Sequence, residues 1–569
     1  MDQPFCRRCV STGRKCDGYM QEPSSTTAPA GNGAFCGRGV LLQSQQLPEV
    51  SQHRPRYIVS SLGCPLRLPS AEAEEYSALS FFDVKTLPGL NGCRKSPSWT
   101  RTLAYFANTV SCVHHAAVAV GALHRAYISP KGTGALNGRD RGGNVSNFAL
   151  QHYNLAISHL LKSSGRSNNA PRDAAVTLLV CYLFTCFDNL AGNHTQAFGH
   201  LRSGITLLNE SWQELKKTRQ ETQLSSDDQA LLKEITEQFR HLDAQAASFL
   251  LGWSVKIEDE ANEIKKPQCR IGPVDIRLSS LSEAAGQLAG LIPKVTELRH
   301  WEIETISKNH VGTKEDATDV AALRQFLRRQ AELVCQLEEW YIAFSMLLPS
   351  DPEKMCGWDG HLARMLQLHY MITSALLNVP AGLGEMACDG SLPKFKKIVA
   401  LASTIADKCS AVLESCVQKE SNREPSFTPE MVLIPVLYLI GTKCRDPLLR
   451  REIISILRRN PRREGVWDSL TAARVLEGVM HIEEGPDVTD FELGLKTMAD
   501  IPLHRRISEI HWGPYNGQFG SENSRMTVWY ELCPTGAEKD GAQSLHVPKH
   551  GIALENCGLS TVFCPVNTG

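Results

Sequence analysis

The sequence predicts an all-α protein, with a large irregular helical body between segments that lack regular pattern. Three observations predict this class. Apolar side chains from about residue 71 to residue 510 recur at steps of three and four, the spacing of amphipathic helices. Glycines and prolines fall mostly between these segments, and alternation of apolar and polar residues is rare before Arg525–Tyr530. The helix pairs do not repeat at a fixed period, so a solenoid is not expected.

The predicted helices follow one another through the body. They lie at Leu79–Phe82, Trp99–Phe106, Val113–Leu123, Phe148–Leu161, Asp173–Leu190 and Gln196–Leu208, in a segment ending near Phe249, and at Ser279–Leu291, Val320–Leu348, His361–Leu377, Phe395–Cys416, Met431–Thr442, Arg450–Arg458 and Asp468–Glu483. The turn at Gly192-Asn193 is short enough to predict antiparallel packing of its two helices. Pro435 stands inside its predicted helix, where a kink is expected.

The organisation of the chain follows from these patterns. We expect an N-terminal motif at 1–19, a flexible linker at 20–70, the helical body at 71–510, and a mostly irregular tail at 511–569, disordered from Cys533. The linker carries turn-forming Ser, Pro and Gly residues without apolar heptads, so no coiled coil is predicted in it.

Composition limits the classes of function. With 569 residues, the chain is long enough to bury a large core. Its 60 Lys and Arg against 61 Asp and Glu leave no global basic excess, so any DNA contact must come from a local patch. No signal peptide opens the sequence, and the longest apolar run, Ala174–Phe187, is too short to span a bilayer. A cytosolic or nuclear protein with reduced cysteines and no membrane partner is predicted.

The N-terminal motif has the spacing Cys6-x2-Cys9-x6-Cys16. Thiolates at this spacing suit zinc, yet a structural zinc site needs four ligands. The alternative is a flexible N-terminus with cysteines at chance spacing. Basic residues surround the thiols: Arg7, Arg8, Arg14 and Lys15.

The segment Pro4–Tyr19, with Asp17-Gly18-Tyr19 after the last cysteine, resembles the second half of the fungal binuclear zinc cluster, a DNA-binding module. The resemblance implies six cysteines around two zinc ions, with Cys6 as a bridging ligand and Cys9 and Cys16 as terminal ligands. It also assigns DNA phosphate contacts to the four basic residues. The first cysteine triplet and its basic helix are absent from the sequence as written. We therefore expect weak or no stoichiometric zinc binding by residues 1–25 alone.

The body resembles the fungal-specific transcription factor domain over roughly residues 70–510. The matching segments are Ser80–Phe82 with Trp99, His115–His124, His152–Ala156, His200–Gly204, Pro435–Tyr438, Cys444–Pro447 with Arg450-Arg451, and Arg462–Ser469. In that family the domain is a helical regulatory and interaction body without a known catalytic role.

Basic residues, mostly arginines, form a cluster between Pro435 and Ser469, the range of the last three of these segments; it is called the arginine cluster below. Its members are Lys443, Arg445, Arg450, Arg451, Arg458, Arg459, Arg462 and Arg463, with only Asp446, Glu452 and Glu464 as nearby acids. One interpretation is an anion-binding or partner surface. The favoured one is that the arginines bridge helix ends and pair with carboxylates. Asp446-Pro447 predicts a helix cap, and Trp467 a core anchor.

Motifs of common enzymes are missing: there is no Gly-x-Ser-x-Gly, His-Glu-x-x-His or phosphate-binding loop. His114 and His115 are adjacent, so both cannot face one side of a helix, and each is interpreted as structural or surface rather than as a ligand. Glu483-Glu484 is interpreted as a solvated helix end. An unrecognised helical enzyme is the least favoured hypothesis.

Two hypotheses about function remain. The first is a nuclear zinc-cluster regulator of RNA polymerase II-dependent genes that binds DNA with zinc as cofactor. The second is a regulator that does not bind DNA and acts through its helical body. Both predict co-regulators or the transcription machinery as partners, and the resemblance allows a homodimer.

Overall fold

The computed structural model divides into two units, 1–65 and 66–569, and every residue described below belongs to the second. The described residues are 70–90, 92, 96–129, 142–163, 170–218, 226–249, 278–302, 305, 317–350, 355, 357–380, 387–414, 425–485, 497–514, 526–532 and 549–553. The motif at 1–19 and the linker lie outside them.

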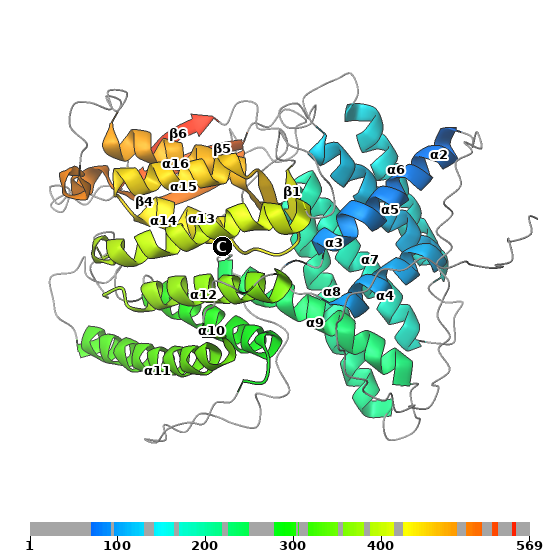
Figure 1. Ribbon diagram of the computed structural model, residues 1–569, viewed down its shortest axis with the longest axis horizontal. Helices are drawn as coiled ribbons and strands as arrows, with labels where there is room; N and C mark the ends of the chain where they lie inside the picture. The colour runs from blue at the N-terminus through cyan, green and yellow to red at the C-terminus, as the bar shows by residue number, and fades with distance from the viewer. Residues whose placement is uncertain are drawn as a thin grey trace, which may run out of the picture. The chain divides into compact units, whose positions relative to one another are not determined.

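The body is helical, which confirms the predicted all-α class (Figure 1). Its first part consists of α2 (Ser70–Phe81), a π-helical turn η1 (Phe82–Thr86), α3 (Leu87–Leu90), α4 (Pro97–Thr109), α5 (Ser111–Ile128), α6 (Gly142–Ser163), α7 (Ala170–Ala191), α8 (His194–Thr218) and α9 (Ser226–Phe249). Its second part consists of α10 (Leu281–Glu302), α11 (Ala317–Leu347), α12 (Gly357–Leu377), η7 (Asp389–Ser391), α13 (Leu392–Glu414), α14 (Ile434–Lys443), α15 (Pro447–Arg459), α16 (Ser469–Glu484), η8 (Met498–Asp500) and η9 (Leu503–Arg505).

Helix starts follow the local chemistry of the sequence. Asp446 accepts a hydrogen bond from Leu449 N at 2.9 Å and Pro447 opens α15, so the predicted cap is confirmed. Asp468 caps α16 in the same way through Thr471 N. Gly192, at φ 78°, forms the turn between α7 and α8, which pack against each other.

Two predictions about proline are wrong. Pro435 lies in the first turn of α14, where its missing N–H costs nothing, so it does not kink the helix. Pro293 does lie inside a helix: α10 continues to Glu302, eleven residues beyond its predicted end at Leu291. Buried contacts of Val295 and Leu298 hold this extension onto the core.

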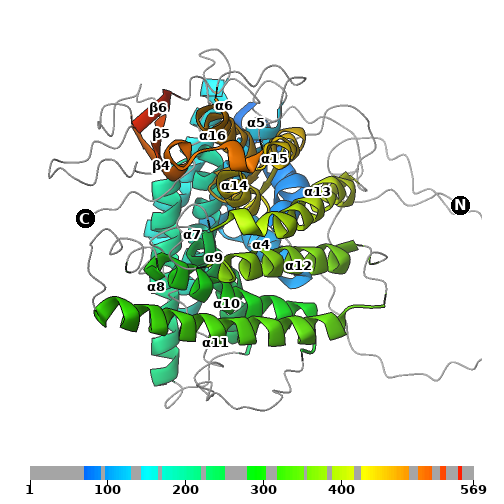
Figure 2. The same cartoon turned by 90° about the vertical axis from the view of Figure 1, so that its left-hand side faces the viewer.

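The core falls into two hydrophobic clusters. The larger joins α2–α9 to α12–α16, with Trp99, Tyr182 and Phe239 among its fully buried side chains. The smaller lies between α10, α11 and α12 around Trp340 and Phe344, whose rings stack 5.0 Å apart. Helix α12 contributes to both clusters and lies beside α13 (Figure 2).

Helix α7 is longer than its predicted apolar run. Within the described residues, Arg172–Ala191 is the one helix that by itself has the length and apolarity to cross a membrane. However, 72% of that window is buried inside the protein, against α5, α8 and α9. We interpret α7 as a core helix of the body, since such helices satisfy the same criterion.

Two small sheets complete the described body. In the first, β1 (Ser426–Thr428) pairs parallel with β2 (Arg462–Glu464), which pairs antiparallel with β3 (Trp467–Asp468). In the second, β5 (Met526–Leu532) lies between β4 (Ile507–Pro514) and β6 (Lys549–Ala553), and both pairings are antiparallel.

The second sheet lies partly in the predicted tail, of which the structure describes residues 511–514, 526–532 and 549–553, all of them in strands. Val528 and Tyr530 point from β5 into the larger core, and the Tyr530 hydroxyl donates to Val475 O of α16 at 3.1 Å. The apolar-polar alternation at Arg525–Tyr530 is typical of a strand with one buried face, and burial of Val528 and Tyr530 explains why this strand forms.

Candidate functional site

The cysteines and basic residues singled out at the N-terminus lie outside the described residues. Zinc binding by Cys6, Cys9 and Cys16 and phosphate contacts by Arg7, Arg8, Arg14 and Lys15 therefore stay predictions. Three thiolates are one donor short of a closed structural zinc site. The described sites all belong to the helical body.

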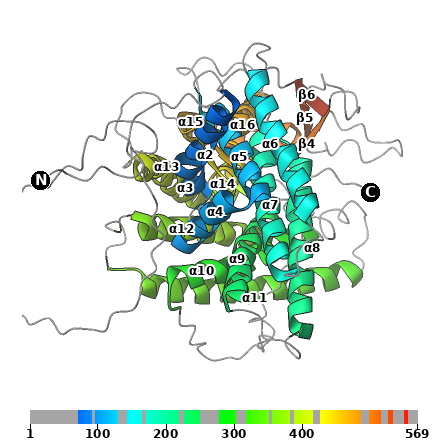
Figure 3. The same cartoon turned by 90° about the vertical axis from the view of Figure 1, so that its right-hand side faces the viewer.

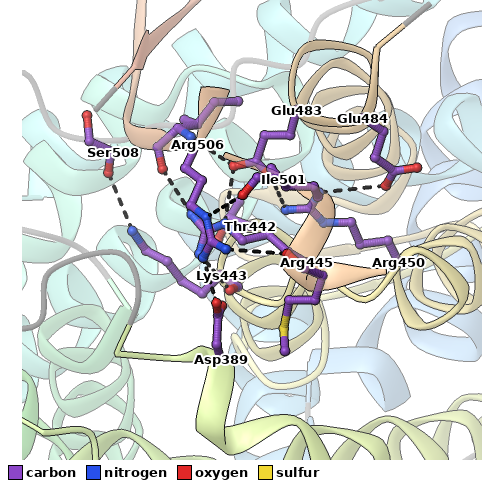
Figure 4. A network of polar contacts seen from close by, with 12 residues as sticks. Asp389, Thr442, Lys443, Arg445, Arg450, Glu483, Glu484, Ile501, Arg506 and Ser508 are labelled. Carbon is purple, nitrogen blue, oxygen red and sulfur yellow. Dashed lines mark hydrogen bonds and ion pairs between the residues drawn. The ribbon is translucent and has the colours of Figure 1, made fainter. Parts of the chain in front are cut away.

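The arginine cluster forms a buried network with the end of α16 (Figure 4). Both Arg445 and Arg450 have fully buried side chains, as does Glu483 between them. The Glu483 carboxylate lies 2.5 Å from Arg450 Nη2 and 3.4 Å from Arg445 Nε. It also accepts a hydrogen bond from the backbone N–H of Ile507 at 2.8 Å. One carboxylate thus joins α15, α16 and β4.

The next residue, Glu484, extends the network along α15. Its side chain is also buried, and it accepts a hydrogen bond from Arg451 Nη2 at 3.0 Å. Arg450 Nη1 lies 3.7 Å from its other oxygen. The interpretation of Glu483-Glu484 as a solvated helix end is therefore wrong. Both carboxylates are buried because arginines of α15 lie opposite them where α15 packs against α16.

A second group of contacts fixes the chain that leads into β4. The buried Arg506 donates to Asp389 Oδ2 at 2.7 Å and to the carbonyls of Ile501 and Met498 at 3.1 and 3.3 Å. Lys443 Nζ donates to Ser508 O at 3.4 Å. These bonds hold residues 498–508 against α14 and the turn η7 (Figure 4).

Glu464, like Glu483, is a buried glutamate that accepts backbone hydrogen bonds, in this case at the start of α14. Its buried Oε2 accepts hydrogen bonds from the backbone N–H groups of Val432, Leu433 and Ile434 at 3.0, 2.7 and 2.9 Å. Burial raises the pKa of Glu464, against the opposing effects of Arg462 and these three donors. The carboxylate satisfies the first donors of the helix, which is why α14 begins at Ile434 rather than at Met431 as predicted.

The remaining arginines of the cluster also have partners in the body. Arg463 donates to the carbonyls of Asn189 and Leu190 at the end of α7, at 3.0 and 2.7 Å. At the surface, Arg458 pairs with Glu477 and Arg459 with Asp407. The prediction that these arginines bridge helix ends and carboxylates is confirmed, and so is the core position of Trp467, which packs on Tyr438.

The sequence could not reveal the acids of this network. Counting nearby carboxylates found Asp446, Glu452 and Glu464, whereas the partners Glu477, Glu483 and Glu484 belong to the next helix, and Asp389 lies more than 50 residues before Arg445. The available signal was a helix ending in two consecutive glutamates that follows a helix rich in arginine.

A small cavity lies where the two hydrophobic clusters meet. It has a volume of about 50 Å³, enough for a few water molecules, and side chains of α9, α10 and α12 line it. On its polar side His241 lies 3.0 Å from Glu430, and Gln245 accepts from Met431 N at 2.8 Å. Its size and its paired polar wall make it a packing feature rather than a site for a large effector.

Helix α5 packs against both α2 and α6 (Figure 3). Histidines of α5 and α6 lie close together in this part of the body, called the histidine face below. His115 Nδ1 and His152 Nδ1 are 3.0 Å apart, and the His159 ring centre lies 5.1 Å from that of His115. The His114 ring lies beside them: its centre is 5.4 Å from that of His115, and its Nε2 lies 2.7 Å from Glu75 Oε1. Adjacent histidines thus contact two different helices.

Burial and mutual proximity keep the His115 and His152 rings neutral at physiological pH. Burial, with the neighbouring His152 and His114, lowers the pKa of His115 to about 4. Burial also lowers the pKa of His152. A neutral imidazole has a free lone pair on one nitrogen and is the form that binds metal ions.

Comparison with known proteins identifies regulators of transcription among the relatives. The chain is 26% identical, over 605 aligned positions, to the aspercryptin biosynthesis cluster-specific transcription regulator atnN of Emericella nidulans, covering 93% of this chain and 91% of that protein. It is 24% identical over 211 positions to the transcription regulator lscL of Purpureocillium lilacinum, covering 37% of this chain and 45% of lscL. No family model matches the chain, and no solved structure matches it. These homologues are named fungal transcription regulators, and neither name is that of an enzyme.

Proposed function

We propose that this protein is a fungal regulator of RNA polymerase II transcription that acts in the nucleus. The observation that carries the proposal is the similarity to atnN, which extends through nearly the whole of both proteins. Since that relative is specific for one biosynthetic gene cluster, we propose that the targets here are also the genes of one biosynthetic cluster. The helical body would receive co-regulators or the transcription machinery.

The structure supports a division of labour within this function. The arginines of the body that were candidates for an anion-binding surface have carboxylate or carbonyl partners inside it. Direct contact with DNA phosphates is proposed for Arg7, Arg8, Arg14 and Lys15, as the resemblance of their segment to the zinc cluster implies. No step is assigned to zinc, because Cys6, Cys9 and Cys16 supply three of the four donors that a closed site needs.

The experiment compares three strains of the source organism: one with the gene deleted, one with a tagged wild-type gene, and one with Cys6, Cys9 and Cys16 changed to serine. RNA sequencing is expected to show loss of expression of a contiguous set of biosynthetic genes in the deletion strain. Chromatin immunoprecipitation is expected to find the tagged protein at their promoters. An unchanged transcriptome under conditions in which the gene is expressed would overturn the proposal.

The serine strain separates direct from indirect promoter binding. If the cysteines assemble part of a DNA-binding unit, their loss abolishes promoter occupancy while the protein level stays the same. Full occupancy by the serine variant would support the second candidate, a regulator recruited through its helical body. The observation that favours this candidate is that Cys6, Cys9 and Cys16 are one donor short of a closed zinc site.

A further inference from the structure

The histidine face of α2, α5 and α6 has the composition of a transition-metal site. One oxygen of Glu75, one nitrogen of His115 and one nitrogen of His152 all lie within 4.8 Å of one another. Two nitrogen ligands of a tetrahedral zinc ion, each about 2.0–2.1 Å from the metal, stand about 3.3 Å apart. The 3.0 Å separation of the two Nδ1 atoms is close to that value.

We propose that Glu75, His115 and His152 bind one zinc ion, with a fourth position open to water. Two imidazoles and one carboxylate form a donor set that suits zinc and disfavours Ca²⁺ and Mg²⁺, which prefer oxygen ligands. His152 is buried, whereas Glu75 and His115 are half-buried, so an ion can enter from the surface. None of these three donors is a cysteine of the N-terminal motif.

The surrounding residues hold the carboxylate in place. His114 Nε2 lies 2.7 Å from Glu75 Oε1, and its Nδ1 lies 3.0 Å from Ala107 O, at the end of α4. A histidine fixed at both nitrogens restricts the rotation of the glutamate that it contacts. Such outer contacts commonly orient metal-binding carboxylates. His114 is therefore a positioning residue and not a ligand.

Without metal, the two rings have an ordinary contact. An Nδ1–H of one imidazole donates to the lone pair of the other at 3.0 Å, which keeps the rings together. For zinc to bind both Nδ1 atoms, the shared proton would move to Nε2 of its own ring by exchange with solvent, so that each neutral ring carries its one proton on Nε2 and no proton is lost. The site is thus preassembled, and binding needs no large movement of α5 or α6.

Zinc bound at this site would link α2 to α5 and α6. Helix α2 packs on α5 through Ala78, beside Gly121, and Arg125 of α5 donates to Ser77 at 2.7 Å. Glu75 is the α2 residue of the site, and His115 and His152 are supplied by α5 and α6. An ion at this position would therefore restrain α2.

The test uses the full-length chain with Cys6, Cys9 and Cys16 changed to serine, so that no thiolate at the N-terminus contributes. The protein is stripped with a chelator and dialysed against Zn²⁺, and its metal content is measured by mass spectrometry. We expect one zinc per chain and a higher melting temperature with zinc. His115→Gln is expected to lower zinc affinity at least tenfold, whereas His504→Gln, at an exposed histidine of η9, should leave it unchanged.

Glu75→Gln provides a milder variant in case loss of His115 disturbs folding. It keeps the shape of the half-buried side chain and is expected to weaken zinc binding while circular dichroism and the metal-free melting temperature stay the same. Replacement by Co²⁺ gives a spectroscopic signature: visible d–d bands without the near-ultraviolet charge transfer of a thiolate site. Absence of bound metal in the serine background, or equal uptake by His115→Gln, would overturn the proposal.

Discussion

The arginine–glutamate network and the histidine face accommodate ionisable side chains in different ways: the network pairs opposite charges, and the histidine face keeps its imidazoles neutral. In the network, Glu483 is fully buried between Arg450 and Arg445, and opposite charges and a backbone donor satisfy it. On the histidine face, His115 and His152 are like groups that are kept neutral, with His115 half-buried and His152 buried. The first region is complete without a ligand and serves the fold. The second keeps lone pairs available, as a binding site must.

The largest expected effect comes from breaking the network at its centre. Glu483→Gln keeps the shape but removes the charge that faces two buried arginines, so the free energy of unfolding should fall by about 3–5 kcal/mol. Chemical denaturation of the full-length protein measures this. Glu452→Gln, at an exposed position of α15, is the matched control. A loss below about 1 kcal/mol would show that the network contributes little.

A buried carboxylate without an arginine sharpens the comparison. Asp188 of α7 is contacted by Asn193, Tyr153 and His200, and burial raises its pKa to about 6. An unfolded aspartate has a pKa of about 3.9, so the folded state binds more protons between these values, and this contribution to stability falls as the pH rises from about 4 to about 6.

Asp188→Asn should therefore stabilise the protein at pH 7, by at most about 3 kcal/mol, and remove this part of the pH dependence. Melting temperatures at pH 5 and pH 7 measure the difference between variant and wild type. The pKa of His200 is lowered, which gives a slope of opposite sign that remains in the variant. Asp173→Asn, in the half-buried first turn of α7, serves as control, and equal profiles for Asp188→Asn and wild type would contradict the expectation.

The support of the histidine face can be tested through its closest helix contact. A Cβ at Gly121 of α5 would lie 2.4 Å from Ala78 O of α2, so Gly121→Ala should displace α2 and cost about 1–3 kcal/mol. It should also weaken zinc binding, because Glu75 moves with α2. Gly286→Ala in α10 meets no atom within 4 Å and should stabilise by about 1 kcal/mol.

The smallest effect is expected at the edge of the network. Arg458 and Glu477 are joined by two hydrogen bonds at 2.8 and 2.7 Å, but both side chains are exposed. Glu477→Gln should cost at most about 0.5 kcal/mol, and the cost should shrink further in 1 M salt. A loss comparable to that of Glu483→Gln would mean that burial does not set the difference between the two regions.

Local features predicted much of the fold. The step of three and four placed nearly all the helices, and the Asp446-Pro447 pair placed the start of α15. Local features failed where distant residues decide. Helix α10 continues past Pro293 because Val295 and Leu298 are buried against α11 and α12, and α14 begins late because Glu464 takes its first N–H groups.

The sites were harder to predict than the fold. The sequence showed the arginines but not their carboxylates, which come from other elements, and it separated His115 from His152 by 37 positions although their rings touch. Burial of a glutamate such as Glu483 cannot be inferred from the helix that carries it, because its partners lie on α15 and β4. The three donors proposed for zinc come from three different helices, so the sequence alone does not show that they meet.

The bond between Ile507 N–H and Glu483 has a consequence for genetics. A premature stop codon at position 506 would remove the Ile507 N–H donor. It would also remove Arg506, which pairs with Asp389, and the buried side chains of Val528 and Tyr530. Although more than four-fifths of the coding sequence would remain, Glu483 would lose its backbone hydrogen-bond donor. Helix α16 would lose its contact with Tyr530 of β5. Such an allele should behave as a null mutation, with its product cleared by quality control, rather than as a regulator that lacks a dispensable tail.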